Sequence, residues 1–167
     1  MIMYHGTYHD IESFKTQSKN TFGRRARVAP VPIFLSPSRE FAAMQVPGLN
    51  GTVLVVKVNP GKVFEGSDLV REDREFWPPE RSDLTAIGKR FHDDLVSGHI
   101  GPKVSENDAP EFIRSMWNED YSTLEDVDVR EWIQKQGYDS FYVTGDGERN
   151  LAVFDPKRLE IVGREKP

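Results

Sequence analysis

The order of hydrophobic and polar positions divides the chain into three stretches. In the first, to about residue 68, short apolar runs alternate with loops, a pattern typical of strands. In the second, about 69–136, apolar residues recur at helical spacing among many charges. The third, about 137–162, returns to short apolar runs. Strands at both ends with helices between them predict an α+β domain and not an alternating, doubly wound parallel sheet.

The clearest strand in the first stretch lies at 51–58, a nearly continuous β-branched run that ends at a turn over 59–61. Residues 1–5 predict a shorter strand that ends at a glycine. Residues 31–36 predict another, which the neighbouring prolines confine to a short or edge position. We expect 62–64 to extend the 51–58 strand beyond its turn.

The third stretch predicts a hairpin. Its strands are 138–143 and 150–154, and they flank a turn at Gly145-Asp146-Gly147 whose loop is longer than the tightest hairpin type. A last strand follows at 159–162, and we expect the polar residues 163–167 to fray.

Helices are predicted at four places. A short one over 39–45 begins after an N-cap at Ser36 or Ser38. Its inward-facing residues are Phe41, Ala42 and Met44. The longer helices are predicted at 83–97, 110–118 and 126–136. We interpret the block 69–136 as a helical cover for a sheet, with a partner-binding insert as the alternative.

Length and charge narrow the class of protein. The 167 residues suffice for one domain with a real core and are too few for two of ordinary size. Acidic residues outnumber basic ones, 27 to 22, which argues against a surface that as a whole binds nucleic acid or anionic membrane. The absence of cysteine excludes disulfides, a thiolate nucleophile and Cys-ligated metals, and it fits a cytoplasmic protein. No apolar run approaches the ~20 residues that span a bilayer, and the amino terminus lacks the features of a signal peptide.

Common catalytic signatures are missing, among them the phosphate-binding loops, the HExxH zinc motif and the GxSxG nucleophile elbow. His5 and His9 are four residues apart, but a strand there argues against a shared helical face, so no metal site is expected. His92 precedes two aspartates and is interpreted as part of a solvated, charged helix face.

The tetrapeptide Tyr4-His5-Gly6-Thr7 is a stronger candidate for chemistry. It presents an imidazole, a bare backbone and a hydroxyl at the end of a strand, and glycine lets a ligand approach main-chain groups closely. Such a set suits the hydroxyls of a sugar. The alternative is a polar strand end with a glycine turn.

Three sequence motifs, taken in their order along the chain, are more specific than the tetrapeptide alone. The tetrapeptide comes first, followed by Ile33-Phe34-Leu35-Ser36 with the Ala-containing helix after it. Gly137-Tyr138-Asp139-Ser140 and Asn150-Leu151-Ala152-Val153-Phe154-Asp155-Pro156 close the set. This order resembles the ADP-ribosyltransferase superfamily, on the side of diphtheria toxin and poly(ADP-ribose) polymerase. It is similar above all to the small domains of phage polyvalent proteins and bacterial effectors. The resemblance covers both ends of the chain, with 69–136 as an insert.

The resemblance implies a split sandwich of two small sheets with NAD, the substrate, in the cleft between them. It implies that the Gly6 backbone binds the nicotinamide carboxamide and that Phe34 shapes the nicotinamide pocket. It also implies that His5 and Thr7 form hydrogen bonds with the ribose on the adenosine side or the nicotinamide side. Arg24 or Arg25 is a candidate for the pyrophosphate, with a solvated loop as the alternative. The implied NAD-binding residues are Tyr4, His5, Gly6, Thr7, Arg24, Phe34, Ser36 and Phe41.

Two positions depart from the family pattern. Gln45 stands where the family has an aromatic residue that stacks on nicotinamide. Phe41, one turn earlier, can take this role only if the helix is oriented differently from that of the family. Asn150 stands at the position of the catalytic glutamate, and the nearest acid is Glu148. A carboxylate stabilises the oxocarbenium-like centre of such a reaction better than an amide does. The catalytic candidates are Glu148, Asn150 and His5.

The expected activity is mono-ADP-ribosyl transfer from NAD to a macromolecule, in the manner of a toxin, an effector or a phage-encoded modifier. Net negative charge favours a protein acceptor over nucleic acid, although the cluster at Arg24-Arg25-Ala26-Arg27 keeps nucleic acid open. NAD hydrolysis is one alternative. A degenerate module that binds NAD, ADP-ribose or a protein partner is another, and Gln45 and Asn150 favour it.

Overall fold

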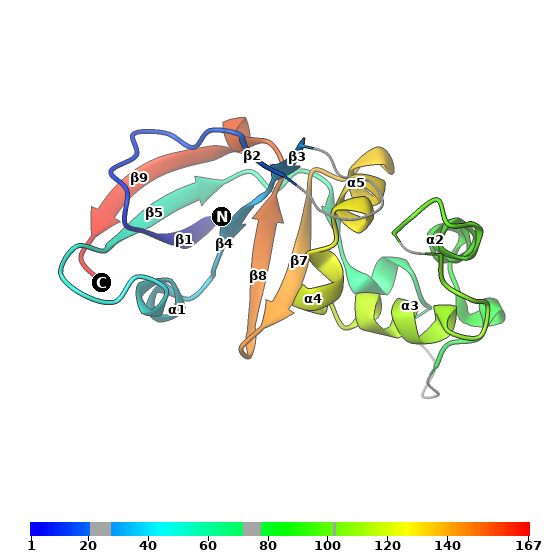
Figure 1. Cartoon of the computed structure of the whole chain (residues 1–167). Helices are drawn as coiled ribbons and strands as arrows, with labels where there is room; N and C mark the ends of the chain where they lie inside the picture. Colours follow the sequence, from blue (N-terminus) through cyan, green and yellow to red (C-terminus); the bar gives the residue numbers. More distant parts are fainter. Residues whose placement is uncertain (21–27, 72–77, 102) are drawn as a thin grey trace.

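The computed structural model describes residues 1–20, 28–71, 78–101 and 103–167. It is a mixed α+β fold with a three-stranded sheet, a four-stranded sheet and a two-stranded ribbon. Figure 1 shows the three-stranded sheet, the four-stranded sheet and the long helices as successive layers. The predicted α+β class is confirmed. None of the helices in the described ranges is long and apolar enough to cross a membrane.

The three-stranded sheet is antiparallel, in the order β1-β5-β9. Its strands are β1 (Ile2–Thr7), β5 (Thr52–Val58) and β9 (Leu159–Glu165). The prediction that 163–167 fray is wrong for Gly163 to Glu165, because this segment pairs with Val53 to Val55. In addition, Arg39 Nε lies 2.6 Å from a Glu165 carboxylate oxygen.

The four-stranded sheet has the order β4-β8-β7-β6. Its strands are β4 (Ile33–Leu35), β8 (Glu148–Val153), β7 (Ser140–Gly145) and β6 (Val63–Phe64). Because β6 pairs in parallel with β7 in this sheet, the prediction that 62–64 extend the 51–58 strand is wrong. The predicted strand over 31–36 is also interrupted. Pro32 separates β4 from β3 (Val28–Val31), which pairs with β2 (Gln17–Asn20) in the ribbon, and a proline cannot donate to a ladder.

A turn of two residues joins β7 to β8, so the predicted longer loop is wrong. Its residues, Asp146 and Gly147, have φ values of 52° and 81°. Two successive positive φ values belong to the tight hairpin turns whose twist matches that of the strands.

Helix α1 (Arg39–Met44) begins after Ser38, whose hydroxyl accepts a hydrogen bond from Phe41 N. The prediction that Met44 faces inward is wrong, since its side chain is 66% exposed, while Ala42 is buried. A helix this short buries one narrow face, and here that face lies against β1 and β5.

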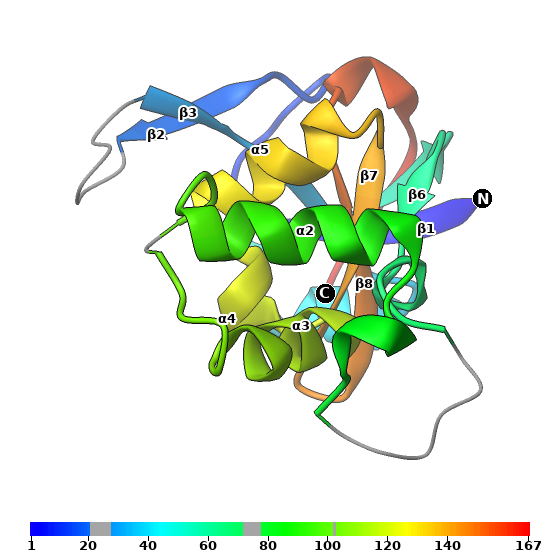
Figure 2. The same ribbon diagram turned by 90° about the vertical axis from the view of Figure 1, so that its right-hand side faces the viewer.

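The long helices cover one face of the four-stranded sheet, and Figure 2 shows them in front of β7 and β8. The long helices are α2 (Ala86–Ser97), α3 (Ala109–Trp117) and α5 (Val127–Lys135), and the short helix α4 (Tyr121–Leu124) lies between α3 and α5 in the chain. The helices α2, α3 and α5 match the predicted helices 83–97, 110–118 and 126–136 to within a few residues, and α4 was not predicted. The larger hydrophobic cluster joins these helices to the sheet, whereas a second cluster lies between the two sheets.

Candidate functional site

A cleft of about 450 Å³ lies where β1, β4, α1, α4 and the β7–β8 turn meet. Two backbone hydrogen bonds between Tyr4 and Ser36, of 2.8 and 2.9 Å, join the two sheets beside it. The residues of the sequence prediction that line this cleft are Tyr4, His5, Gly6, Phe34, Ser36, Phe41 and Asn150. Segments from both ends of the chain therefore converge on one concave surface.

A second cleft, of about 560 Å³, adjoins the first. His5 and Phe34 line both, and Thr7 lines only the second. Thr7 Oγ1 accepts a hydrogen bond of 3.0 Å from His9 N, so its hydroxyl is partly engaged in the local turn. Arg24 and Arg25, predicted for the pyrophosphate, lie outside the described residues.

The hydrogen bonds of His5 define its protonation. Its Nδ1 lies 2.9 Å from the backbone oxygen of Phe34, and because a carbonyl only accepts, Nδ1 carries the proton. Burial lowers the pKa of the ring, more than this hydrogen bond raises it. The ring is therefore neutral near pH 7, and its Nε2 is an acceptor. A ligand hydroxyl is the natural partner for such a nitrogen.

Gly6 has a structural role in addition to the one predicted from sequence. A Cβ at this position would lie 2.3 Å from the backbone oxygen of Ala42 and 3.0 Å from a methyl group of Val46. The close packing of α1 on β1 therefore requires glycine here. Gly6 also lines the cleft, so its backbone remains open to a ligand on that side.

Asn150 carries an unusual polar atom. Its Oδ1 is buried and has no hydrogen-bond partner among the described residues, although the side chain lines the cleft. Buried acceptors in proteins are almost always paired. A ligand that donates a hydrogen bond from within the cleft would satisfy this oxygen.

The acid that shares the cleft lining with Asn150 is not the one that the sequence predicts. Glu148 is the first residue of β8 and so shares a strand face with Asn150, but it lines neither of the two clefts. Asp146, at the tip of the turn, does line the first cleft. The tight turn places Asp146 in the cleft lining. Because a longer loop was expected from the sequence, this position of Asp146 was not predicted.

Aromatic residues line the cleft from four elements. Tyr4 comes from β1, Phe34 from β4, Phe41 from α1 and Tyr121 from α4. Gln45, at the C-cap of α1, lies in the same lining, so the amide and Phe41 share this wall. Tyr121 could not be predicted as a cleft residue, because α4 has a single turn and no clear periodicity.

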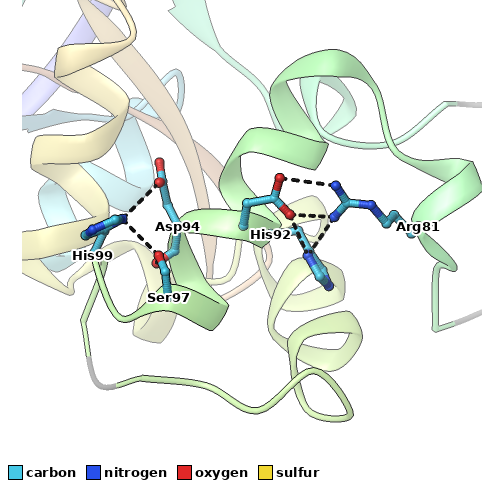
Figure 3. Close-up of polar contacts among 6 residues, drawn as sticks. Arg81, His92, Asp94, Ser97 and His99 are labelled. Atoms are coloured by element: carbon cyan, nitrogen blue, oxygen red, sulfur yellow. Dashed lines mark hydrogen bonds and ion pairs between the residues drawn. The ribbon is translucent and has the colours of Figure 1, made fainter.

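The histidines of α2 and its end form polar clusters outside the cleft (Figure 3). Ser97 Oγ and an Asp94 carboxylate oxygen lie 2.9 and 3.4 Å from the same atom, His99 Nδ1. A catalytic Ser-His-Asp triad instead uses opposite ring nitrogens for the two partners. The cluster is thus a polar cap at the end of α2.

The other cluster corrects a sequence prediction. The His92 side chain is only 13% exposed, so it is not part of a solvated face. Its Nδ1 lies 3.1 Å from an Arg81 nitrogen, and Arg81 makes two hydrogen bonds to Asp93. These contacts attach the segment before α2 to the helix. Within the described ranges, no group of three His, Asp or Glu side chains is arranged to hold a metal ion.

A comparison with protein-family models found no match, and neither did a comparison with curated proteins. Among solved structures, the chain is similar to one described as the crystal structure of an anti-CRISPR protein. The sequence identity is 14% and the TM-score 0.45, over 93% of this chain and 90% of that chain. A similarity this low assigns neither a family nor a function.

Proposed function

We propose that the chain is a mono-ADP-ribosyltransferase that uses NAD as its substrate, with the split two-sheet sandwich of that superfamily. One observation carries the proposal. The motifs that resemble the superfamily lie at opposite ends of the sequence, and their residues line a single cleft beside the junction of the two sheets. Residues that resembled the family by chance would have no reason to meet.

The two adjoining clefts suit a dinucleotide. Ligand pockets have volumes of about 300–1,000 Å³, and both clefts lie within that range. Because His5 and Phe34 border both, a molecule with two nucleoside halves can occupy them together. His5 Nε2 accepts from a ribose hydroxyl at their junction, and Asn150 Oδ1 accepts from a donor in the first cleft.

In the proposed reaction the bond between ribose C1′ and nicotinamide breaks, and its electron pair leaves with the nicotinamide. The ribose becomes oxocarbenium-like, a nucleophile of the acceptor attacks C1′, and the nucleophile loses its proton. Asn150 orients the ribose but carries no charge. Asp146 is the carboxylate in the cleft lining, and we assign to it the stabilisation of the cation or the acceptance of the proton.

A second function has an observation in its favour. Asn150 stands where the superfamily has its catalytic glutamate, and Asp146 is an exposed residue at a turn tip. Both features fit a module that binds NAD or ADP-ribose without cleaving it. Hydrolysis of NAD uses the same cleft with water as the acceptor.

Incubation with NAD labelled on the adenylate, with and without cell lysate, separates the three functions. Label in a macromolecule supports transfer, and free nicotinamide without labelled macromolecule supports hydrolysis. Binding of NAD with neither labelled macromolecule nor free nicotinamide supports a module that binds NAD without cleaving it. A His5→Ala variant is the control, since it should lose most of the NAD affinity while remaining folded. Absence of NAD binding by the wild-type protein would refute the proposal.

A further inference from the structure

Tyr121 is a large aromatic residue in an unusual place. It belongs to the short helix α4, within the block 69–136 that the resemblance covers only as an insert, yet it lines the cleft with β1 and β4 residues. Its side chain remains 41% exposed. Its ring centroid lies 5.7 Å from that of Phe34, with the ring planes inclined by 46°. An exposed ring that packs on one aromatic residue leaves another face for a ligand.

The rest of the cleft determines which ligand group suits that face. Phe41 adds a further aromatic wall, and the backbone of Gly6 has no side chain on the cleft side. The unpaired Asn150 Oδ1 supplies an acceptor. Aromatic walls with an unpaired buried acceptor between them suit a flat heteroaromatic ring whose substituent donates a hydrogen bond.

Contacts beside Tyr121 fix the start of α4 to the hairpin that carries Asn150. The backbone oxygen of Glu119 accepts a hydrogen bond of 2.7 Å from Thr144 N, and Asp120 forms a bridge with Thr144. The Glu119 carboxylate receives two hydrogen bonds from Arg149, of 2.6 and 2.5 Å. Because Arg149 adjoins Asn150 in β8, these contacts join the backbone that carries Tyr121 to the strand that carries Asn150. A wall fixed before binding loses little entropy when the ligand arrives.

We infer that Tyr121 is a specificity-determining residue that stacks on the nicotinamide ring of NAD, so that the helical insert supplies one wall of the substrate site. The inference rests on the proposed function and names the residue that recognises one half of the substrate. It also gives the position of Gln45 an explanation, since an aromatic side chain from another element takes over the stacking.

The test compares two ligands that differ in the nicotinamide group. Carba-NAD is a NAD analogue that is not cleaved, and ADP-ribose lacks nicotinamide. Calorimetric titrations measure the affinity of the wild-type protein, Tyr121→Ala and Tyr121→Phe for each. Stacking of a base on an aromatic side chain contributes directly to affinity, so Tyr121→Ala should bind carba-NAD roughly tenfold more weakly. Its affinity for ADP-ribose should stay within about twofold, and Tyr121→Phe should bind both as the wild type does.

Each other outcome counts against a specific claim. Unchanged carba-NAD affinity in Tyr121→Ala, or an equal loss for both ligands, overturns the role of Tyr121 and leaves the proposed function standing. A wild-type protein that binds neither ligand overturns the proposed function and this inference with it. If Tyr121→Ala fails to fold, Tyr121→Gln replaces it, because glutamine fills a similar space without a ring.

Discussion

At the scale of single residues, two polar atoms of the cleft are prepared for a ligand. His5 is held by its hydrogen bond to Phe34 and kept neutral by burial, which leaves Nε2 free to accept. Asn150 Oδ1 is buried without a partner among the described residues. Unpaired buried acceptors destabilise the free protein and are satisfied when a donor binds. The site thus gives up a little stability in favour of recognition.

The lowered pKa of His5 predicts a pH dependence. A histidine whose pKa is lower in the folded state than in the unfolded state binds fewer protons when folded, so stability rises with pH through that range. As the pH falls below the ordinary value of 6.5, the wild-type protein should therefore lose stability relative to His5→Gln, which has no such group. Urea unfolding at pH 7.5 and 5.5 measures the difference. Parallel curves for the two proteins would contradict a neutral, buried His5.

The acid in the cleft is tested by a pair of amide substitutions. Asp146 lines the cleft and Glu148, two residues later, does not. Asp146→Asn should lower transfer by about 10²–10³ and leave NAD affinity within a few-fold, because the charge acts mainly on the developing cation. Glu148→Gln should keep most of the activity.

The two variants differ only in which carboxylate is removed, so each is the control for the other. If Glu148→Gln loses transfer and Asp146→Asn keeps it, the assignment from the family resemblance is right and ours is wrong. If both remain active while Asn150→Ala is inactive, the site works by orienting the ribose with an amide.

At the scale of elements, the junction between the helical block and the β7–β8 hairpin is the point on which the site depends. Glu119 is only 7% exposed and has a φ of 55°, a conformation that non-glycine residues rarely adopt. It binds Arg149, and its carboxylate also lies 3.4 Å from Gly66 N. Arg149 in turn reaches Glu65 and lies over the ring of Tyr142, 3.8 Å from its centroid. The Glu119 side chain thus ties the segment between α3 and α4 to the hairpin and to Gly66.

Removal of the Glu119 charge should therefore lower the stability of the folded protein more than removal of the charge of an exposed residue. Glu119→Gln weakens two charge-assisted hydrogen bonds, and we expect about 1–2 kcal/mol of lost stability, a value reduced because the Arg149 side chain is 47% exposed. Glu111→Gln is the matched control, since Glu111 pairs with Arg114 across 3.3 Å on the solvated side of α3 and should change stability by less than about 0.5 kcal/mol. Urea unfolding compares them. Equal effects would mean that the Glu119 contacts are no stronger than a surface pair.

At the scale of the whole molecule, the four-stranded sheet is shared by two cores. Phe141, Val143 and Ala152 belong to the cluster under the helices, whereas Leu151 and Val153 belong to the cluster between the sheets. Alternate residues of a strand face opposite sides, so β7 and β8 contribute to both cores at once. The helices cannot be removed without exposing one face of this sheet.

This arrangement predicts that the block 69–136 does not unfold by itself. Hydrogen exchange should give the slowest amides of α2 and α5 the same opening free energy as those of β7 and β8, within about 1 kcal/mol. Among the described residues, the strands β2 and β3 pair with each other and with no other strand, so they serve as an internal reference of lower protection. Two separate unfolding transitions, one of them confined to the helical block, would show that the block is an independent domain.

The elements with strong periodicity could be predicted from the order of the residues alone. The β-branched run of β5, the apolar spacing of α2 and α5 and the α+β order follow from burial of one face or both, which local composition encodes. Short elements without such a pattern were missed or misjudged, among them α4, β2 and the tight turn at Asp146. Their conformation depends on partners distant in sequence, such as Thr144 for the start of α4.

The residues of the candidate site also fall into a group that the sequence predicts and a group that it does not. The ordered motifs identified Tyr4, His5, Gly6, Phe34 and Asn150 as a set, and the fold brings them together. Which further residues join them depends on how distant segments pack together. Tyr121 and Asp146 enter the cleft because the Glu119–Arg149 contacts and a two-residue turn aim them there, and Thr7 lines the neighbouring cleft. Direction in space is a property of packing between distant segments, and local sequence does not carry it.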